Sequence, residues 1–396
     1  MHFQKSNKIK LLLCSLISVN LFANTNLDES ILSDSRKKTF DLEKEQAKED
    51  SSKLKKDWIN QVIFKYTKNL GDEYKSETSS IRIDQPIFQS GGIYQAIKYA
   101  NSTHDYANLQ IQQERKNLIK DAYNLLFQIK KLDLNIQKTK LSLANAKIDV
   151  QRKKEQVLNG FLDSSFLDNA LLTLNSSKHT LVDLKYQKQE LINSFENIAS
   201  GKYNNFELPK FEFISKEEYL EKNIELEKAK ASIKKDKNYS HMTMARYLPS
   251  VNVYYNYSKT HYSDGKPNAE QTNDQTYGLY ITMPLDSRAL NDIESKRIEY
   301  LKSKLNLKNK IDDEKSFFKT KLDKLSMLED RLKITSEDLS LYDSILEIIK
   351  EEKEAQIKTQ SDYDTLKNSR DIKLLDAQVY KIDKQIILLE LYSKVY

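Results

Sequence analysis

Cysteine is almost absent from this sequence, which holds a single one, Cys14, among its 396 residues. One cysteine cannot form a disulfide bond within a chain, so no disulfide framework stabilises the fold. Cys14 also lies in an N-terminal segment that we expect to be removed, which leaves the mature chain without a thiol nucleophile. The fold must therefore be held by packing and polar contacts.

Signals of catalysis are lacking as well. The histidines are scattered at His2, His104, His179, His241 and His261, without a pair at metal-ligand spacing. The sequence contains no glycine-rich phosphate loop and no nucleophile motif. We therefore expect no enzyme, no catalytic residues, no metal and no cofactor.

Strong charge of one sign is missing too. Lys and Arg number 64 against 58 Asp and Glu, and the two signs are interleaved along the chain. Interleaved charges are typical of solvated helix faces, so we expect no nucleic-acid partner.

The N-terminal 23 residues have the pattern of a secretory signal peptide. Basic residues precede an apolar run at positions 11–22, and Ala23 ends a plausible cleavage site. A lipid anchor at Cys14 is the alternative, but only three apolar residues precede that cysteine. After this segment no apolar run reaches 18 residues, so we expect strands to make any membrane crossing.

Glycine and proline are scarce, at 7 and 5 residues, which favours long helices. Between Gly92 and Gly160 neither occurs, and a helix there would be about 100 Å long at 1.5 Å per residue. Apolar residues recur in sevens at Ile129, Ile136, Leu143, Val150 and Val157, and again at Ile311, Phe318, Leu325, Leu332, Leu339 and Leu346. This spacing predicts packed, coiled-coil-like helices.

Four short stretches alternate instead, at residues 58–68, 79–88, 251–258 and 277–283. Alternation of apolar and polar residues at this length is typical of transmembrane strands. The polar set that we expect to line a water-filled lumen is Lys65, Arg82, Asp84, Asn252, Asn256 and Thr282. Trp58, Tyr66, Tyr255, Tyr257 and Tyr277 are either interfacial aromatic girdles or ordinary sheet packing.

The pattern of two strands followed by long helices occurs twice along the chain. Pro86 and Pro284, which we expect at the two strand-to-helix joints, lie 198 positions apart (284 minus 86). We infer a tandem duplication of a strand–strand–helix–helix unit. The predicted segments are a signal peptide (1–23), an N-terminal periplasmic helix (24–57), a transmembrane β-hairpin (58–88), a long helical hairpin with its tip near 159–165 (89–200), an equatorial linker and helix (201–248), a second β-hairpin (249–286), and a second helical hairpin with its tip near 355–361 (287–396).

Four strands cannot close a barrel, and an open sheet edge in lipid leaves backbone donors unsatisfied. The barrel must then be shared between copies of the chain. Two copies would give an eight-stranded barrel, whose interior is filled by its own side chains. Three copies would give a twelve-stranded barrel, which leaves room for water. The polar lumen set favours three or more copies.

Three segments resemble the TolC-like outer-membrane efflux proteins. They are IDQPIF at residues 83–88 followed by Gly91 and Gly92, GFLDSSFLDNA at 160–170, and TQSDY at 359–363. The resemblance implies a homotrimer in the outer membrane of a Gram-negative bacterium, with a twelve-stranded β-barrel continuous with a twelve-helix periplasmic tunnel. It further implies a passive exit duct of a tripartite efflux or type I secretion system, docked to a periplasmic adaptor (membrane fusion) protein and an inner-membrane pump of RND, ABC or MFS type.

The same resemblance suggests site residues. Asp362, and more weakly Asp364, would ring the narrow periplasmic mouth; the alternative is that Asp362 only favours a helix N-terminus. The first tip, Gly160, Phe161, Leu162 and Asp163, would dock the adaptor, unless its apolar residues pack against a neighbouring tip. The strand-to-helix joints would be Pro86, Gly91, Gly92 and Pro284.

Two positions depart from the family pattern. Ala355 and Gln356 stand where the family usually has a glycine at the second tip, and Asn60 stands where it usually has a proline before the first strand. Competing functions are a periplasmic adaptor, which would have one helical hairpin, and a purely structural coiled-coil protein, which would not need alternating strands.

Overall fold

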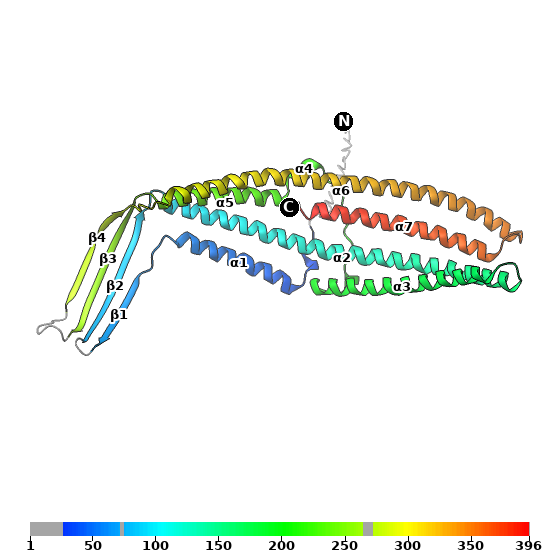
Figure 1. Ribbon diagram of the computed structural model, residues 1–396, viewed down its shortest axis with the longest axis horizontal. Coiled ribbons are helices and arrows are strands. Elements are labelled where there is room, and N and C mark those ends of the chain that lie inside the picture. Colours follow the sequence, from blue (N-terminus) through cyan, green and yellow to red (C-terminus); the bar gives the residue numbers. More distant parts are fainter. Residues whose placement is uncertain (1–26, 72–74, 264–271, 396) are drawn as a thin grey trace, which may run out of the picture.

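The computed structural model describes residues 27–71, 75–263 and 272–395. The predicted signal peptide, Cys14 and the loop around Gly265 lie outside these residues. Figure 1 shows a long rod of helices with a β-sheet at one end. This confirms the predicted mainly α class with a small β part. Among the helices of the described residues, none is long and apolar enough to cross a membrane.

Two very long helices run the length of the rod, α2 (Gly92–Leu158) and α6 (Ala289–Glu354). Each turns back at the far end into a shorter helix, α3 (Ser164–Ile198) and α7 (Gln360–Tyr392). The half next to the sheet is completed by α1 (Asp34–Lys56) and α5 (Ile224–Arg246). Short elements η1 (Glu29–Ile31), η2 (Tyr203–Asn205) and α4 (Lys216–Glu221) lie at the middle of the rod.

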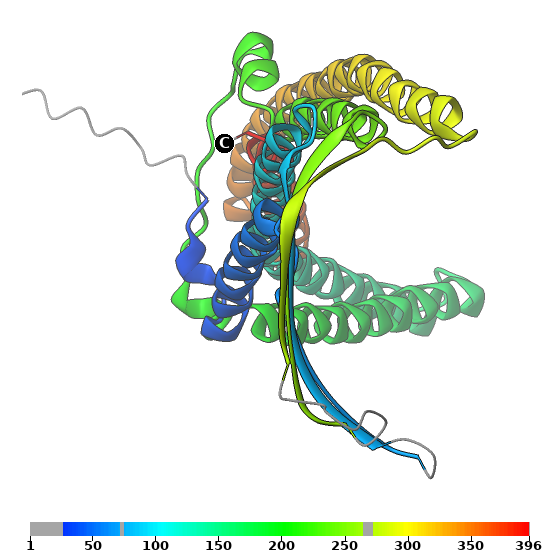
Figure 2. The same ribbon diagram turned by 90° about the vertical axis from the view of Figure 1, so that its left-hand side faces the viewer.

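The helices form one open, curved layer. In the tip half, α3 packs against α2, α2 against α7, and α7 against α6; in the sheet half the order is α1, α2, α5, α6. Figure 2 shows the layer bending in an arc when it is viewed along the rod. The heptad residues explain this packing, because Ile129, Ile136, Phe318 and Leu325 are buried between neighbouring helices.

The sheet contains β1 (Ile63–Leu70), β2 (Lys75–Phe88), β3 (Ser250–Ser263) and β4 (Asn273–Thr282). Its order is β1-β2-β3-β4, with every neighbouring pair antiparallel. The two hairpins, far apart in sequence, thus join through β2 and β3. Both outer strands, β1 and β4, have one partner strand among the described residues.

The densest core lies at the middle of the rod, where Phe127, Phe195, Tyr219 and Leu389 are almost fully buried. At this level the shorter helices meet end to end in two places. Leu32 before α1 pairs with Ala199 after α3, and Asn223 before α5 pairs with Val395 after α7. These two junctions occupy matching positions in the two halves of the chain.

The structure departs from the sequence-based expectations at three elements. Trp58 precedes β1, which begins only at Ile63. Pro86 lies inside β2, which continues to Phe88 with a register shift after Pro86. The single helix expected within residues 201–248 is divided into α4 and α5, because the Asn223 side chain caps α5 by accepting from the N–H groups of Glu225 and Leu226.

Candidate functional site

The sheet has one polar and one apolar face. Directly opposed residues of neighbouring strands project to the same side, and residues two apart on a strand share a face. The register pairs Arg82 with Asn256 and Lys65 with Ser80, and it pairs Thr282 with Ser250. All six residues predicted to line the lumen therefore lie on the polar face.

Three polar-face side chains from three strands form a hydrogen-bonded group. The Tyr280 hydroxyl donates to the Asp84 carboxylate, whose oxygens lie 2.8 and 2.7 Å away. The Asn252 amide, between them on β3, donates to the Tyr280 hydroxyl at 2.9 Å. These hydrogen bonds connect β2, β3 and β4 across the polar face.

The opposite face is apolar, exposed on the outer strands β1 and β4 and mostly half-buried on the inner strands β2 and β3. Its residues are Phe64, Tyr66, Ile81, Ile83, Val253, Tyr255, Tyr257, Tyr277, Leu279 and Ile281. Four of the five aromatic residues singled out from the sequence are in this set. Trp58 is the exception, because it lies off the sheet.

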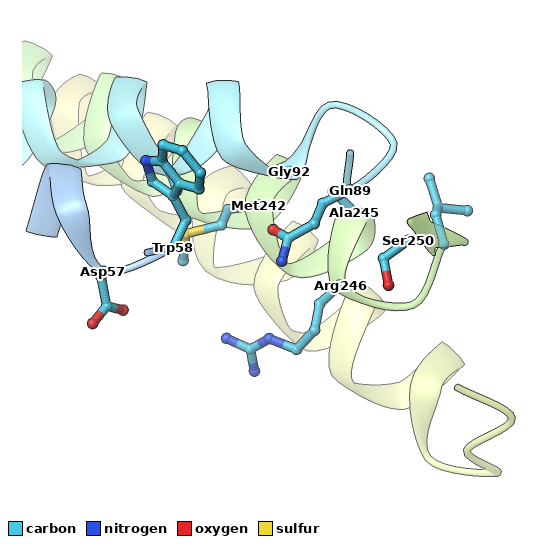
Figure 3. Close-up of a pocket in the computed structure, with 10 residues that line it drawn as sticks. Asp57, Trp58, Gln89, Gly92, Met242, Ala245, Arg246 and Ser250 are labelled. Atoms are coloured by element: carbon cyan, nitrogen blue, oxygen red, sulfur yellow. The ribbon is translucent and has the colours of Figure 1, made fainter. Parts of the chain in front are cut away.

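Trp58 instead lines a pocket of about 250 Å³ where the sheet meets the helices. Figure 3 shows it beside Met242 of α5, while Arg246 extends away from the helices. Gly92 also lines this pocket, and a Cβ there would lie 3.3 Å from the Cβ of Ala245. The close approach of α2 and α5 at this joint thus depends on a residue without a side chain.

The first joint is held by hydrogen bonds between side chains and backbone groups. Pro86 has no N–H to donate, and just before it the Gln85 amide both accepts from the Asn60 N–H at 2.9 Å and donates to the Asn60 carbonyl. After β2, Gly91 adopts a φ of 84° as the N-cap of α2, and the Ser90 hydroxyl donates to the Pro249 carbonyl at 2.6 Å. At the second joint, Pro284 is exposed and follows the end of β4.

The first tip ends α2 in a Schellman motif. Gly160 adopts a φ of 73°, the Phe161 N–H donates to the Gln156 carbonyl at 2.8 Å, and the Gly160 N–H donates to the Val157 carbonyl at 3.0 Å. Asp163 then caps α3 by accepting from the Ser165 N–H. Phe161 is left 79% exposed, whereas Leu162 is half-buried.

The second tip has the same motif without a glycine. Gln356 takes the left-handed position with a φ of 61°, the Ile357 N–H donates to the Glu352 carbonyl at 2.8 Å, and the Gln356 N–H donates to the Lys353 carbonyl at 3.0 Å. Ile357, at the position equivalent to Phe161, is 70% exposed. The missing glycine therefore leaves the tip geometry unchanged.

Asp362 lies at the start of α7 and makes two kinds of contact. One carboxylate oxygen accepts from the Thr359 N–H and hydroxyl in a capping box, and the other pairs with Arg152 of α2 at 2.7 Å. The Thr359 hydrogen bonds, followed by Arg152, hold the pKa of Asp362 below its ordinary value. Asp364 accepts only from the Gln360 amide, at 2.7 Å, among the contacts of the described residues.

Arg152 and Asp362 form the tip-most rung of a ladder between α2 and α7. The other rungs, seven residues apart on each helix, are Lys131–Asp383, Lys138–Asp376 and the polar contact of Asn145 with Asn368 and Ser369. Every cation of the ladder is on α2 and every anion on α7. The register of the two helices thus brings complementary charges together along their contact.

A second apolar stripe on α6 escaped the sequence analysis. Met327, Ile334, Leu341 and Ile348 recur in sevens and are exposed, with Ile334 at 58%. They lie two positions beyond Leu325, Leu332, Leu339 and Leu346, about 200° further around the helix. The other border of the layer, α3, likewise exposes Leu172, Val182 and Tyr186. Two heptad series offset by two residues were the signal that could have revealed this stripe.

The residues that the structure describes contain no group of three or more His, Cys, Asp or Glu side chains able to hold a metal ion. The features that remain are surfaces: a two-faced sheet, an open helical layer with apolar borders, and two tips with exposed apolar residues.

Comparisons with known proteins agree with this picture. Residues 46–199 match the family model described as outer membrane efflux protein. No curated protein sequence matches the chain. Solved structures with the same fold include the Campylobacter jejuni CmeC outer membrane channel, at 13% identity and a TM-score of 0.71, covering 93% of this chain and 84% of that one.

Two further structures share the fold. The outer membrane protein VceC from Vibrio cholerae is 13% identical, with a TM-score of 0.68 over 90% of this chain and 92% of that one. The open state of the Neisseria gonorrhoeae MtrE outer membrane channel is 11% identical, with a TM-score of 0.66 over 93% of this chain and 88% of that one.

Proposed function

We propose that three copies of this chain form one continuous duct, a proposal supported by the match of residues 46–199 to the family model described as outer membrane efflux protein. In this proposal the sheets form a twelve-stranded barrel in the outer membrane, and the helical layers form a twelve-helix tunnel across the periplasm of a Gram-negative bacterium. The duct is passive and performs no enzymatic reaction. An inner-membrane pump supplies the energy.

The observation that carries this proposal is the pair of open borders that sheet and layer share. β4 and α6 lie at one border, whereas β1, α1 and α3 lie at the other. A strand edge in lipid would leave backbone groups unpaired at a cost of several kcal/mol each, so β1 of one copy needs β4 of another. Joining one border to the opposite one repeats head to tail and can close a ring.

The two sheet faces support the same arrangement. With the apolar face toward lipid, the polar face with Lys65, Arg82, Asp84, Asn252, Asn256 and Thr282 would enclose water. Three copies give twelve strands, enough for a lumen, whereas an eight-stranded barrel is filled by side chains. The matching junctions at Leu32–Ala199 and Asn223–Val395 support the tandem duplication that we propose for the two halves.

Disulfide trapping tests the assembly. Ile334→Cys on α6 and Val182→Cys on α3 lie at comparable distances from their tips, on the two exposed borders. We expect the double variant, purified from membranes in detergent, to form oxidised species up to a trimer. Lys333→Cys combined with Val182→Cys is the control, since Lys333 lies about 100° away around α6. Monomers only, or equal trapping in the control, would overturn the arrangement.

We assign the tips to docking of a periplasmic adaptor protein, which would connect the duct to a pump of RND, ABC or MFS type. Exposed apolar side chains in equivalent positions, Phe161 and Ile357, support this assignment. Gly160, Leu162 and Asp163 would shape the first docking site. We expect Phe161→Ser to weaken adaptor cross-linking in cells without changing trimer formation. Unchanged cross-linking would count against a docking role for Phe161.

We place the narrow mouth of the duct at the start of α7. The carboxylates of Asp362 from three copies would meet there, with Asp364 further from the mouth. The capping box and Arg152 give Asp362 a structural role within one copy as well, and both roles use the same position.

A further inference from the structure

Tyr254 lies flat against the polar face of the sheet, across its neighbour Gly278. The two residues are directly opposite in the β3–β4 register. A Cβ at position 278 would lie 2.9 Å from Cε1 and 3.0 Å from the hydroxyl of Tyr254. The ring therefore occupies the space that any side chain at position 278 would need. Within the strands of the described residues, Gly278 is the only glycine.

Tyr280 lies against the same wall but leans the other way. Its hydroxyl reaches across β3 to Asp84 on β2. Its ring centroid is 6.0 Å from that of Tyr254, at an interplanar angle of 49°. The two tyrosines thus cover three strands. Hydrogen bonds hold Tyr280, whereas the Tyr254 ring lies in the space left by the missing side chain of Gly278. A glycine covered by an aromatic ring from the next strand is a known way to stabilise a sheet.

We propose that Gly278 determines the open width of the barrel lumen, because it allows Tyr254 to lie along the wall instead of projecting into the lumen. This inference rests on the proposed duct. A side chain at position 278 would displace the ring, and the sheet backbone blocks movement away from the lumen. The ring would then turn inward, once in every copy, and three rings would narrow the passage.

Single-channel conductance in planar bilayers tests the proposal. We expect Gly278→Val to form detergent-stable trimers with a lower conductance than the unaltered protein. Tyr254→Ala combined with Gly278→Val should restore the conductance, since the displaced ring is gone. Gly278→Ala, which adds only the Cβ, provides a milder version should valine prevent assembly. Because the tip mouth is in series with the barrel, the comparison is repeated in an Arg152→Ala background.

Partitioning of polyethylene glycols added from the sheet side gives an independent size measurement. The excluded size should fall in Gly278→Val and recover in the double variant. Equal conductance and equal size exclusion in Gly278→Val and unaltered trimers would overturn the proposed role of Gly278 but not the proposed duct. A loss of conductance that removal of Tyr254 does not rescue would also overturn it. No conductance from the unaltered trimers would overturn the duct, and this inference with it.

Discussion

At the scale of single residues, the second tip shows how backbone geometry can override residue preference. A non-glycine residue in the left-handed region costs about 1–2 kcal/mol. At Gln356 this cost is offset by two hydrogen bonds at the end of the helix. The N–H groups of Gln356 and Ile357 donate to backbone carbonyls of the last helical turn. The sequence alone showed only that the usual glycine is missing from this tip, whereas the motif depends on hydrogen bonds.

Replacing Gln356 by glycine should therefore stabilise the second tip by about 1 kcal/mol, or roughly fivefold in local opening. Hydrogen exchange of the Gln356 and Ile357 amides measures this directly, and both should exchange more slowly in the variant. Gly160→Gln at the first tip is the matched reverse change and should speed exchange of the Phe161 amide. Faster exchange in Gln356→Gly would show that the left-handed residue is not strained.

Glu314 is the most deeply buried charged residue of the described chain, with its side chain 3% exposed. Burial alone would raise its pKa, but hydrogen bonds from Lys394, Tyr219 and Asn223 outweigh burial and hold that pKa below its ordinary value. A pKa lowered on folding gives stability that is present above the ordinary value of 4.5 and is lost as pH falls below it. Glu314 is thus an acid-sensitive contact of the equatorial core.

We expect Glu314→Gln to lower the free energy of unfolding by about 3 kcal/mol near neutral pH, because the partly buried Lys394 loses its partner. The difference from the unaltered protein should shrink as pH falls below 4.5. Thermal melting from pH 3 to 7 measures both effects. Glu329→Gln, which breaks the exposed pair with Lys384, is the control and should change little. A pH-independent difference would assign the loss to packing instead of charge.

At the scale of elements, the sequence predicted the long helices well and the strands less well. The helix bounds at Gly92 and Leu158 follow from local signals. These are the absence of glycine and proline between Gly92 and Gly160, apolar residues at seven-residue spacing, and terminal caps. Pro86 was expected at the joint but lies inside β2, beside a contact of the Gln85 side chain with Asn60 that joins residues 25 positions apart. Likewise α5 begins just after its cap Asn223, whose backbone pairs with Val395, a partner that no local pattern reveals.

The exposed stripe on α6 gives a prediction for this element. Leu341→Glu places a charge on the border that we propose to meet the next copy, while the other heptad series stays intact. We expect an unchanged helix content by circular dichroism and a loss of trimers on unheated gels. Lys333→Glu, a charge on a different face of the same helix, should still form trimers. Trimers of normal heat stability in Leu341→Glu would remove this stripe from the interface.

At the scale of the whole molecule, the polar-face residues could be predicted from alternation alone, whereas the four-stranded sheet that brings them together could not. Nothing local indicates that β2 pairs with β3 or that sheet and layer end at the same two borders. Those features arise from packing between distant segments, and they determine how copies can join. The contact of Asp362 with Arg152 belongs to this class too, because it joins α7 to α2 across the layer.

At the proposed mouth of the duct, two variants should have opposite effects on block by divalent cations. Arg152→Ala removes the tip-most rung of the α2–α7 ladder and frees one carboxylate oxygen of Asp362. An exposed ion pair contributes only about 0.2–1 kcal/mol, so trimers should persist while the mouth opens more readily. We expect a higher conductance and stronger block by divalent cations, since three unpaired carboxylates bind them better.

Asp362→Asn removes the charge itself, so block by divalent cations should weaken while the capping position keeps a polar side chain. Titration of the blocking cation in planar bilayers compares the two variants with the unaltered protein. Asp364→Asn is the control and should leave the block unchanged, because that carboxylate contacts only Gln360 within the described residues. Equal block in Asp362→Asn and the unaltered protein would place the narrow mouth elsewhere and leave Asp362 with its capping role only.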